Sequence, residues 1–352
     1  MTSIIEMPEL VMEKIIEFSD FQSVLTLRQV CRDFRNFIDD LKDSKLPDSK
    51  FKQIKIFAIF DNSKNTITFD FVDPEGSSIR IEYSEMENSR TFETEDNPEQ
   101  ITTTILGNSN IVDVAIRDLE LALKFQKTKL EWLYLNFNNF QLQNGSSIHT
   151  LLIKMNTIFT NPNRRIKTRR IAISTFNESL VLPMLQLADP ETLEVINFLG
   201  MDHVPEVEAG EIVKTEQWKK AVQLRCEFYL MNLNIENVCH FSTIFSKMNL
   251  ITSRDLDTLK KTFLSSSKFE KWDLHCKYFD EQEELSDIWG PALDSGSIRE
   301  WYFRMKTSEE KILRIGVIYT PMIRREHNLI HFDIWKTTDV PDGAVIQGHS
   351  EN

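Results

Sequence analysis

The sequence is poor in cysteine, glycine and proline. Its 352 residues include only 4 cysteines, 10 glycines and 11 prolines. The cysteines have no C-x-x-C spacing, and three of them lie in apolar-patterned segments, where free buried cysteine is usual. This pattern argues against a disulfide scaffold and favours a reducing compartment. The scarcity of glycine and proline argues against long disordered linkers.

Long apolar runs and excess positive charge are also missing. No stretch approaches the roughly 18 apolar residues that span a bilayer, and the first residues, MTSIIE, lack the features of a signal peptide. The formal net charge of −13 disfavours general binding to nucleic acid or to anionic membranes. We therefore expect a cytoplasmic protein with neither of these partners. The basic run Arg164–Arg170 is a nuclear signal, with the nucleus as an alternative location, or an anion-binding patch, or else a solvated lead-in to a strand.

Reactive constellations are lacking as well. His327 and His331 have the spacing of a zincin pair, but the glutamate of His-Glu-x-x-His is missing and the pair bridges a turn and a predicted strand. His275 and Cys276 are neighbours on a predicted strand, so they point to opposite faces and cannot form a dyad. No P-loop, Gly-x-Gly-x-x-Gly or Gly-x-Ser-x-Gly motif is present. We expect no catalytic residues, no metal and no cofactor, and hence not an enzyme.

The first forty residues predict three short amphipathic helices. Pro8 suits the first turn of a helix, where its missing NH would have no partner. Ser19 or Asp20 can cap the second helix, and Val30, Phe34 and Ile38 are typical of the third. A unit of about 40 residues barely builds its own core. The surplus of apolar positions therefore predicts that a partner or the following domain completes it.

These residues resemble an F-box. The similarity lies in Met7-Pro8-Glu9, Ile15-Ile16, Leu27–Arg35 and Ile38-Asp39. Met7 stands where the family has leucine and Phe34 where it has tryptophan, and both keep a large apolar side chain. The resemblance implies docking onto the Skp adaptor, and through it onto a cullin, in a Skp-cullin-F-box (SCF) ubiquitin ligase. The implied docking residues are Pro8, Leu10, Val11, Ile15, Ile16, Val24, Leu25 and Leu27.

After the F-box, at 1–48, the pattern changes to strands. Alternating apolar and polar residues at 53–60, 66–72 and 78–83 predict a small antiparallel β-meander. The stretch 82–99 holds seven acidic residues, which indicates a solvated loop or, alternatively, a site for a basic partner. We assign the meander and the acidic loop together to 49–100.

From 101 to 338 a strand followed by an amphipathic helix recurs. Because parallel strands need long crossovers, this predicts an irregular leucine-rich-repeat-like α/β solenoid, within an α+β or α/β fold class; an ordinary α/β sandwich is the alternative. The predicted strands begin at Leu130, Ile171, Leu193, Val222, Phe269 and Ile298, and the predicted helices cover 110–126, 148–159, 181–188, 241–248 and 256–264. A C-terminal β-hairpin, 312–319 with 329–335 around the polar turn 324–328, would cover the last sheet edge. The tail 339–352 is predicted to be flexible.

This order of F-box, β-meander and repeats resembles the nematode F-box proteins with an FTH-type C-terminal domain, a domain whose function is largely unassigned. The runs 218–228 and 255–279 are the most typical. We expect exposed strand positions to form a target-binding wall, because side chains alternate along a strand and aromatic residues and arginine dominate interfaces. The candidates are Trp132, Tyr134, Asn136, Lys271, Asp273, His275, Glu300, Tyr302 and Arg304. In the alternative, a neighbouring element covers Trp132 and Tyr134.

The sequence thus predicts a non-catalytic adaptor that recruits a target protein to an SCF ubiquitin ligase. The alternative is a non-degradative protein-interaction scaffold with a weak or vestigial F-box.

Overall fold

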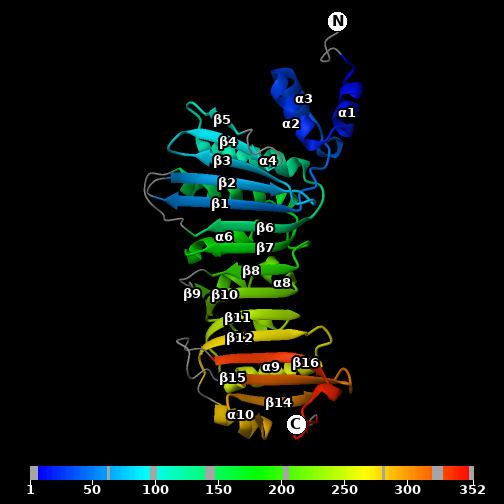
Figure 1. Cartoon of the computed structure of the whole chain (residues 1–352), viewed down its shortest axis with the longest axis vertical. Helices are drawn as coiled ribbons and strands as arrows, with labels where there is room; N and C mark the ends of the chain where they lie inside the picture. Colours follow the sequence, from blue (N-terminus) through cyan, green and yellow to red (C-terminus); the bar gives the residue numbers. More distant parts are fainter. Residues whose placement is uncertain are drawn as a thin grey trace. The chain divides into compact units, whose positions relative to one another are not determined.

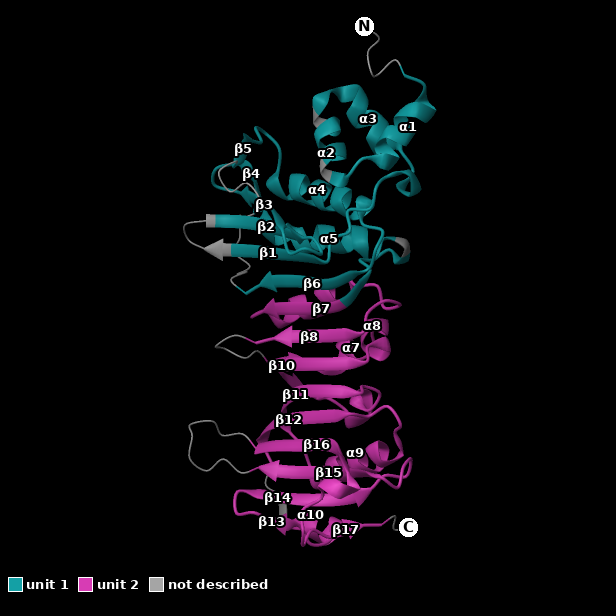
Figure 2. Ribbon diagram, turned by 45° about the vertical axis from the view of Figure 1, so that its right-hand side comes forward, with its two compact units in different colours: residues 1–169 teal, residues 170–352 magenta. Residues whose placement is uncertain are grey.

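The computed structural model describes residues 7–61, 64–95, 101–138, 147–200, 206–279, 282–318 and 328–348. The chain forms two compact units, residues 1–169 and 170–352, which are coloured separately in Figure 2. Short 3₁₀-helices occupy Asp43–Lys45, Ile148–Thr150, Pro162–Arg164, Glu178–Leu180, Ile235–Val238 and Thr337–Asp339. None of the helices in the described ranges is long and apolar enough to cross a bilayer.

The first unit begins with three helices, α1 (Glu9–Phe18), α2 (Phe21–Val30) and α3 (Arg32–Asp40) (Figure 1). Of the two candidate caps for α2, Asp20 is the one that acts: its carboxylate accepts a hydrogen bond of 2.7 Å from the backbone NH of Ser23. Arg28 of α2 donates two hydrogen bonds, of 2.7 and 3.0 Å, to Asp39 of α3. These two bonds fix α2 against α3.

The sheet of the first unit is a meander extended by one parallel strand. β1 (Gln53–Asp61), β2 (Lys64–Val72), β3 (Ser78–Ser84), β4 (Ser89–Thr94) and β5 (Thr102–Ile105) pair antiparallel in sequence order, and β6 (Leu130–Phe137) pairs parallel with β1. The three strands of the predicted meander are confirmed. The prediction of a loop at 82–99 was wrong in part, because the last three residues of β3 and all of β4 lie in this stretch. Arg80 stands opposite Glu93 in the register, so opposite charges support the β3–β4 pairing.

Two helices cover one face of this sheet and complete the core of the three-helix segment. α4 (Ile111–Phe125) begins at Asn110, whose side chain accepts hydrogen bonds from the backbone NH groups of Val112 and Asp113, and α5 (Leu151–Phe159) lies beside α4. Phe125 of α4 is fully buried. It belongs to the same apolar cluster as Ile16, Val24, Ile38, Leu41 and Leu46 of the F-box segment. The next domain therefore covers part of the surplus apolar surface.

The second unit begins as a parallel sheet. β7 (Thr168–Thr175), β8 (Val195–Leu199), β10 (Gln223–Met231), β11 (Thr243–Leu250) and β12 (Lys271–Tyr278) are parallel neighbours, and β9 (Glu206–Glu208) pairs with the end of β10. The connections contain α6 (Val181–Leu185), α7 (Ala209–Ile212), α8 (Glu216–Lys220) and α9 (Ser253–Ser265). The predicted Thr252–Asp255 capping box starts α9. The helix predicted at 241–248 was wrong: most of this segment is β11, hydrogen-bonded between β10 and β12.

The end of the second unit is antiparallel. α10 (Gln282–Trp289) and β13 (Leu293–Asp294) precede β14 (Ile298–Arg304), β15 (Lys311–Ile318) and β16 (Asn328–Lys336), with β17 (Ile346–Gln347) last. β15 and β16 pair as the predicted hairpin, but β16 pairs with β12 and β15 with β14.

Two expectations about this end are therefore corrected. The hairpin lies inside the sheet rather than at its edge, and β14 runs opposite to the parallel set. The parallel series that a solenoid requires therefore stops at β12, and the structure is a mixed α/β fold. β17 pairs with β14, so the predicted flexible tail contains a strand. The turn residues 324–327 lie outside the described residues.

Candidate functional site: two interaction surfaces

The F-box helices sort their apolar side chains into an outer and an inner set. Leu10 is 66% exposed and Val11 43%, beside an exposed Pro8. Ile16 and Val24 are 1% and 0% exposed, inside the core shared with α4. The docking role expected of Ile16 and Val24 is thus corrected, because side chains this deeply buried cannot touch a partner. Ile15 and Ile16 point about 100° apart on a helix, so only one of them can face the core.

The remaining implied docking residues are half-buried. Ile15 lies on α1 beside the exposed set. Leu25 lines a cleft of about 510 Å³ between α2, α4 and the meander, together with Phe21. Leu27 packs against the F-box core. The exposed apolar residues Met7, Phe18 and Val30, which the sequence reasoning did not include, lie in the same three-helix segment. Helical periodicity places Phe18 near the rows of Leu10 and Val11 on α1, although it was not among the implied docking residues.

The second surface is the open face of the strands. In β12, Trp272, Leu274 and Cys276 are buried, whereas Lys271, Asp273 and His275 lie on the other face, exposed or half-buried, as predicted. In β6 the same alternation leaves Trp132, Tyr134 and Asn136 half-buried.

In each unit, neighbouring side chains pack beside the predicted target-binding residues on the open face of the strands. The ring of Tyr134 is 5.6 Å from that of Phe57 on β1, and its hydroxyl accepts a hydrogen bond of 3.0 Å from Asn136. His275 packs against Phe245 of β11, with ring centroids 5.1 Å apart. The guanidinium of Arg225, on β10, lies 5.0 Å from the Phe245 ring. Half-exposed aromatic rings therefore occur on the open sheet face of each unit taken by itself.

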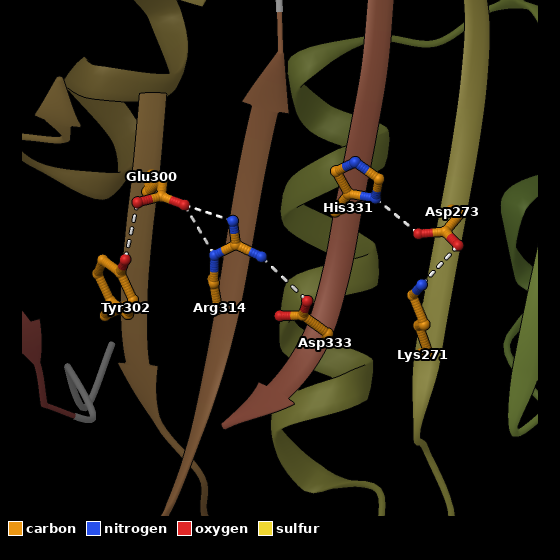
Figure 3. Close-up of polar contacts among 7 residues, drawn as sticks. All are labelled: Lys271, Asp273, Glu300, Tyr302, Arg314, His331 and Asp333. Carbon is orange, nitrogen blue, oxygen red and sulfur yellow. Dashed lines mark hydrogen bonds and ion pairs between the residues drawn. The ribbon is translucent and has the colours of Figure 1, made fainter. Parts of the chain in front are cut away.

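The C-terminal strands carry a polar network on the open face, drawn in Figure 3. His331 Nδ1 on β16 lies 2.6 Å from Asp273 Oδ1 on β12, directly opposite in the register, and Lys271 Nζ lies 2.8 Å from Asp273 Oδ2. This half of the network joins β12 to β16. Of the predicted residues, Lys271 and Asp273 are brought together here. His327, the other member of the zincin-like spacing, lies outside the described residues.

The other half of the network is centred on Arg314 of β15. Its Nε donates a hydrogen bond of 2.8 Å to Glu300 on β14, and its Nη1 donates one of 3.0 Å to Asp333 on β16. The Tyr302 hydroxyl donates a hydrogen bond of 2.9 Å to Glu300. The guanidinium also lies 4.6 Å from the ring centroid of Trp335. One arginine therefore joins three strands, a position for which its planar fork of donors is suited.

Two of the expected wall residues are covered. Tyr302 is 1% exposed and Glu300 9%, because Arg314 bonds Glu300 and Trp335 packs edge-on against the Tyr302 ring. Neither side chain is available to a partner, which corrects their expected role. Arg304 is half-buried at the strand end and bonds the carbonyl of Glu309.

Sequence reasoning missed four contributors to the open face: Phe245, Arg314, His331 and Asp333. The alternation of Asp333 between the apolar residues Phe332 and Ile334 was a usable signal once the hairpin was predicted. Phe245 was predicted to lie on a helix, so its position on the open face of a strand was not predicted.

Three groups of the network, Asp273, Arg314 and Tyr302, have shifted pKa values. Burial acts to raise the pKa of Asp273, but the hydrogen bonds from Lys271 and His331 outweigh it and hold the pKa below its usual value. Burial acts to lower the pKa of Arg314, and the neighbouring Glu300 and Asp333 reverse this and raise it. Burial and the hydrogen bond to Glu300 raise the pKa of Tyr302 to about 12, so its hydroxyl stays a neutral donor.

The buried thiols face the core and are protonated at neutral pH. Burial raises the pKa of Cys226 to about 12 and that of Cys276 to about 11. A thiol with so high a pKa is a poor nucleophile. Within the described ranges, no group of three or more His, Cys, Asp or Glu side chains is placed to hold a metal ion. The arrangement supplies fixed charges and aromatic surface, which suit recognition.

Two family models match separate parts of the chain. Residues 4–46 match the F-box domain model, and residues 149–287 match the FTH domain model. The chain is 21% identical over 319 residues to F-box A protein 224 of Caenorhabditis elegans, covering 89% of this chain and 77% of that protein. No solved structure matches the chain. The resemblance to nematode F-box proteins that carry an FTH domain is therefore confirmed by matches to both domain models, in the expected order, and by similarity to a nematode F-box protein.

Proposed function

We propose that this protein is a non-catalytic adaptor. Its F-box docks onto a Skp-type adaptor, and its C-terminal part holds a target protein for ubiquitin transfer by the cullin-based ligase that the Skp adaptor joins. The observation that carries the proposal is the exposed apolar surface of α1, where Leu10, Val11 and Phe18 face solvent inside the segment that matches the F-box model. Exposed apolar patches on small units are typical of interaction sites.

The size of the expected contact follows from those side chains. Full burial of a leucine or valine side chain contributes about 1.5–3 kcal/mol. Leu10 and Val11 together could therefore account for a change of two or more orders of magnitude in affinity. A glutamate at either position would make the contribution of that side chain to the binding free energy unfavourable, because burying a carboxylate without a partner costs more than the apolar contact contributes.

Co-purification with a Skp-type adaptor tests the docking. Wild type should bind, and Leu10→Glu with Val11→Glu should not, because both side chains are exposed and the fold does not need them. Ile153→Glu is the matched control, since Ile153 is 65% exposed on α5 and lies outside the F-box. A double variant that binds like wild type would show that α1 is not the docking surface. If wild type does not bind, the alternative hypothesis of a non-degradative interaction scaffold with a weak or vestigial F-box is favoured.

For the target we propose the open face of the second unit. Phe245, His275 and Trp335 offer half-exposed aromatic surface beside fixed charges, and aromatic side chains near charged groups are frequent interface anchors. The ion pairs between strands hold these side chains in place before binding, which lowers the ordering cost.

Retention of a partner protein by wild type and by variants of this face tests the proposal. Proteins retained by wild type in a nematode extract should be lost from Phe245→Glu and kept by Leu250→Glu, a control 62% exposed at the end of the same strand. Equal retention by both variants would move the target site elsewhere.

We further propose a cytoplasmic location. All four cysteines are free thiols, which suits a reducing compartment. Microscopy of the tagged protein provides the test. Nuclear accumulation that is lost with Arg164→Ala and Arg165→Ala would favour the nuclear alternative.

A further inference from the structure

A basic groove lies in the first unit, away from the exposed face of α1. Its volume is about 950 Å³, and the end of α4, the residues before β7 and the F-box segment at 39–44 line it. Seven cationic side chains line it against three acidic ones, Asp39, Asp43 and Glu120. The cations are Arg28, Arg117, Lys124, Lys127, Arg164, Arg165 and Lys167. The groove therefore has a local excess of positive charge in a chain whose net charge is −13.

The cations fall into three groups by their partners. Arg28 and Arg164 are paired with Asp39 and Glu120, at 2.7 and 3.2 Å. The Nζ atoms of Lys124 and Lys127 donate to the backbone carbonyls of Asp39 and Ser44, at 2.7 and 3.3 Å. These carbonyl contacts position the two ammonium groups without cancelling their charge.

Three further cations have no ion-pair partner within the described part of the chain: Arg117, Arg165 and Lys167. Arg117 and Lys167 are exposed, and the Nε of the half-buried Arg165 is buried without a hydrogen bond. The charges of these three side chains are therefore not offset by an acidic side chain within the described residues.

The spacing of the cations favours several separate negative charges over one. Arg117 and Lys124 are seven residues apart on α4, which is about 10 Å along the helix axis, beyond the reach of one phosphate group. Leu123 and Ile158, both half-buried, line the groove among the cations and offer apolar contact. A volume of this size is at the upper end of the range for ligand sites, about 300–1,000 Å³.

These features fit a peptide better than a nucleic acid. The one aromatic side chain among the lining residues, Phe159, is 3% exposed and offers no stacking platform to a base. The net charge of the chain repels a long polyanion, but the screening length at physiological ionic strength is about 8 Å, so a short segment experiences mainly the local field. We propose that this groove binds an acidic segment of a partner protein, with aspartate or glutamate side chains on the cations and apolar side chains on Leu123 and Ile158.

The test is binding of a fluorescein-labelled peptide of alternating glutamate and leucine to the full chain, followed by anisotropy at 0.15 M salt. We expect saturable binding that weakens as salt rises. Arg117→Glu with Lys167→Glu should weaken it at least tenfold, since both side chains are exposed and lie outside the F-box. Lys268→Glu with Lys306→Glu is the control, because it makes the same charge change at exposed sites in the second unit.

Three results would overturn the proposal: no binding to wild type, equal weakening by the control pair, or equal binding of a peptide with lysine in place of glutamate. Tenfold tighter binding of a phosphoserine peptide or of single-stranded RNA would replace the acidic segment with that ligand. Co-purification of the groove variant with the Skp-type adaptor should be unchanged, so failure of the groove and failure of F-box docking can be distinguished.

Discussion

Replacing Arg314 with methionine should destabilise the second unit by about 3 kcal/mol. The side chains of Arg314 and Glu300 are only 15% and 11% exposed, and that of Asp333 is 21% exposed, so solvent screens them weakly. The substitution keeps most of the apolar stem over Trp335 but removes three charged hydrogen bonds, two to Glu300 and one to Asp333. It leaves Glu300 buried with Tyr302 as its remaining side-chain donor. Breaking a buried ion pair on one side costs about 3–5 kcal/mol, and the partial exposure of Asp333 places this case at the lower end.

Urea unfolding followed by tryptophan fluorescence measures this loss. Five of the six tryptophans lie at or beyond Trp218, so the signal reports mainly on the second unit. Arg299→Met is the control, because the Arg299–Asp294 pair is long, at 3.5 Å, and its side chains are 33% and 56% exposed. The free energy of unfolding of the Arg299→Met control should fall by less than about 1 kcal/mol. The reasoning is refuted if Arg314→Met loses no more than the control, since that would mean water replaces the arginine at no cost.

Three further outcomes follow from burial and from shifted pKa values. Ile16→Ala should lower the stability of the first unit by about 2–5 kcal/mol while Leu10→Ala changes it little, because Ile16 is in the core and Leu10 is exposed; urea unfolding of the two variants compares them. Burial acts to raise the pKa of Asp257, but hydrogen bonds from Lys260, Lys261 and Trp289 lower it to about 2. This depressed pKa should contribute about 2 kcal/mol above pH 5, lost as the pH falls through 2, and acid unfolding of Asp257→Asn should lack that contribution. Cys226 and Cys276 should resist a thiol reagent at pH 8 until the chain unfolds, since both are buried with raised pKa values; rapid native labelling would contradict this.

The local spacing of apolar residues predicted most helices and strands correctly. It failed where one segment fitted both the helical and the strand periodicity. Phe241, Ile244, Phe245 and Met248 have helical spacing, yet Ile244, Ser246 and Met248 also alternate as a buried strand face. Pairing with β10 and β12 decided between the two, and that pairing is not visible within ten residues of sequence. In the acidic stretch, charge suggested a loop, but the opposite charges of Arg80 and Glu93 support a β-ladder.

Strand order was the other property that local pattern could not supply. The hairpin was predicted from alternation, but its insertion between β12 and β14 depends on which faces and edges meet. The same limit applies to Tyr302, whose alternation correctly placed it on the open face. Its burial comes from Trp335 and Arg314, which reach it from elements after β14 in the chain.

The apolar residues of the F-box segment divide into a set buried against α4 and a set exposed on α1, and this division supports the proposed function most directly. Sequence predicts a surplus of apolar positions and that something must cover it, without saying which residues the following domain takes. Phe125 and Leu121 of α4 supply the answer: they pack with Ile16, Val24 and Ile38, and Phe21 meets the Phe125 ring at 5.1 Å. What this packing leaves exposed on α1 is Leu10, Val11 and Phe18. Because α4 covers the inner set, a partner that binds the outer set need not open the core.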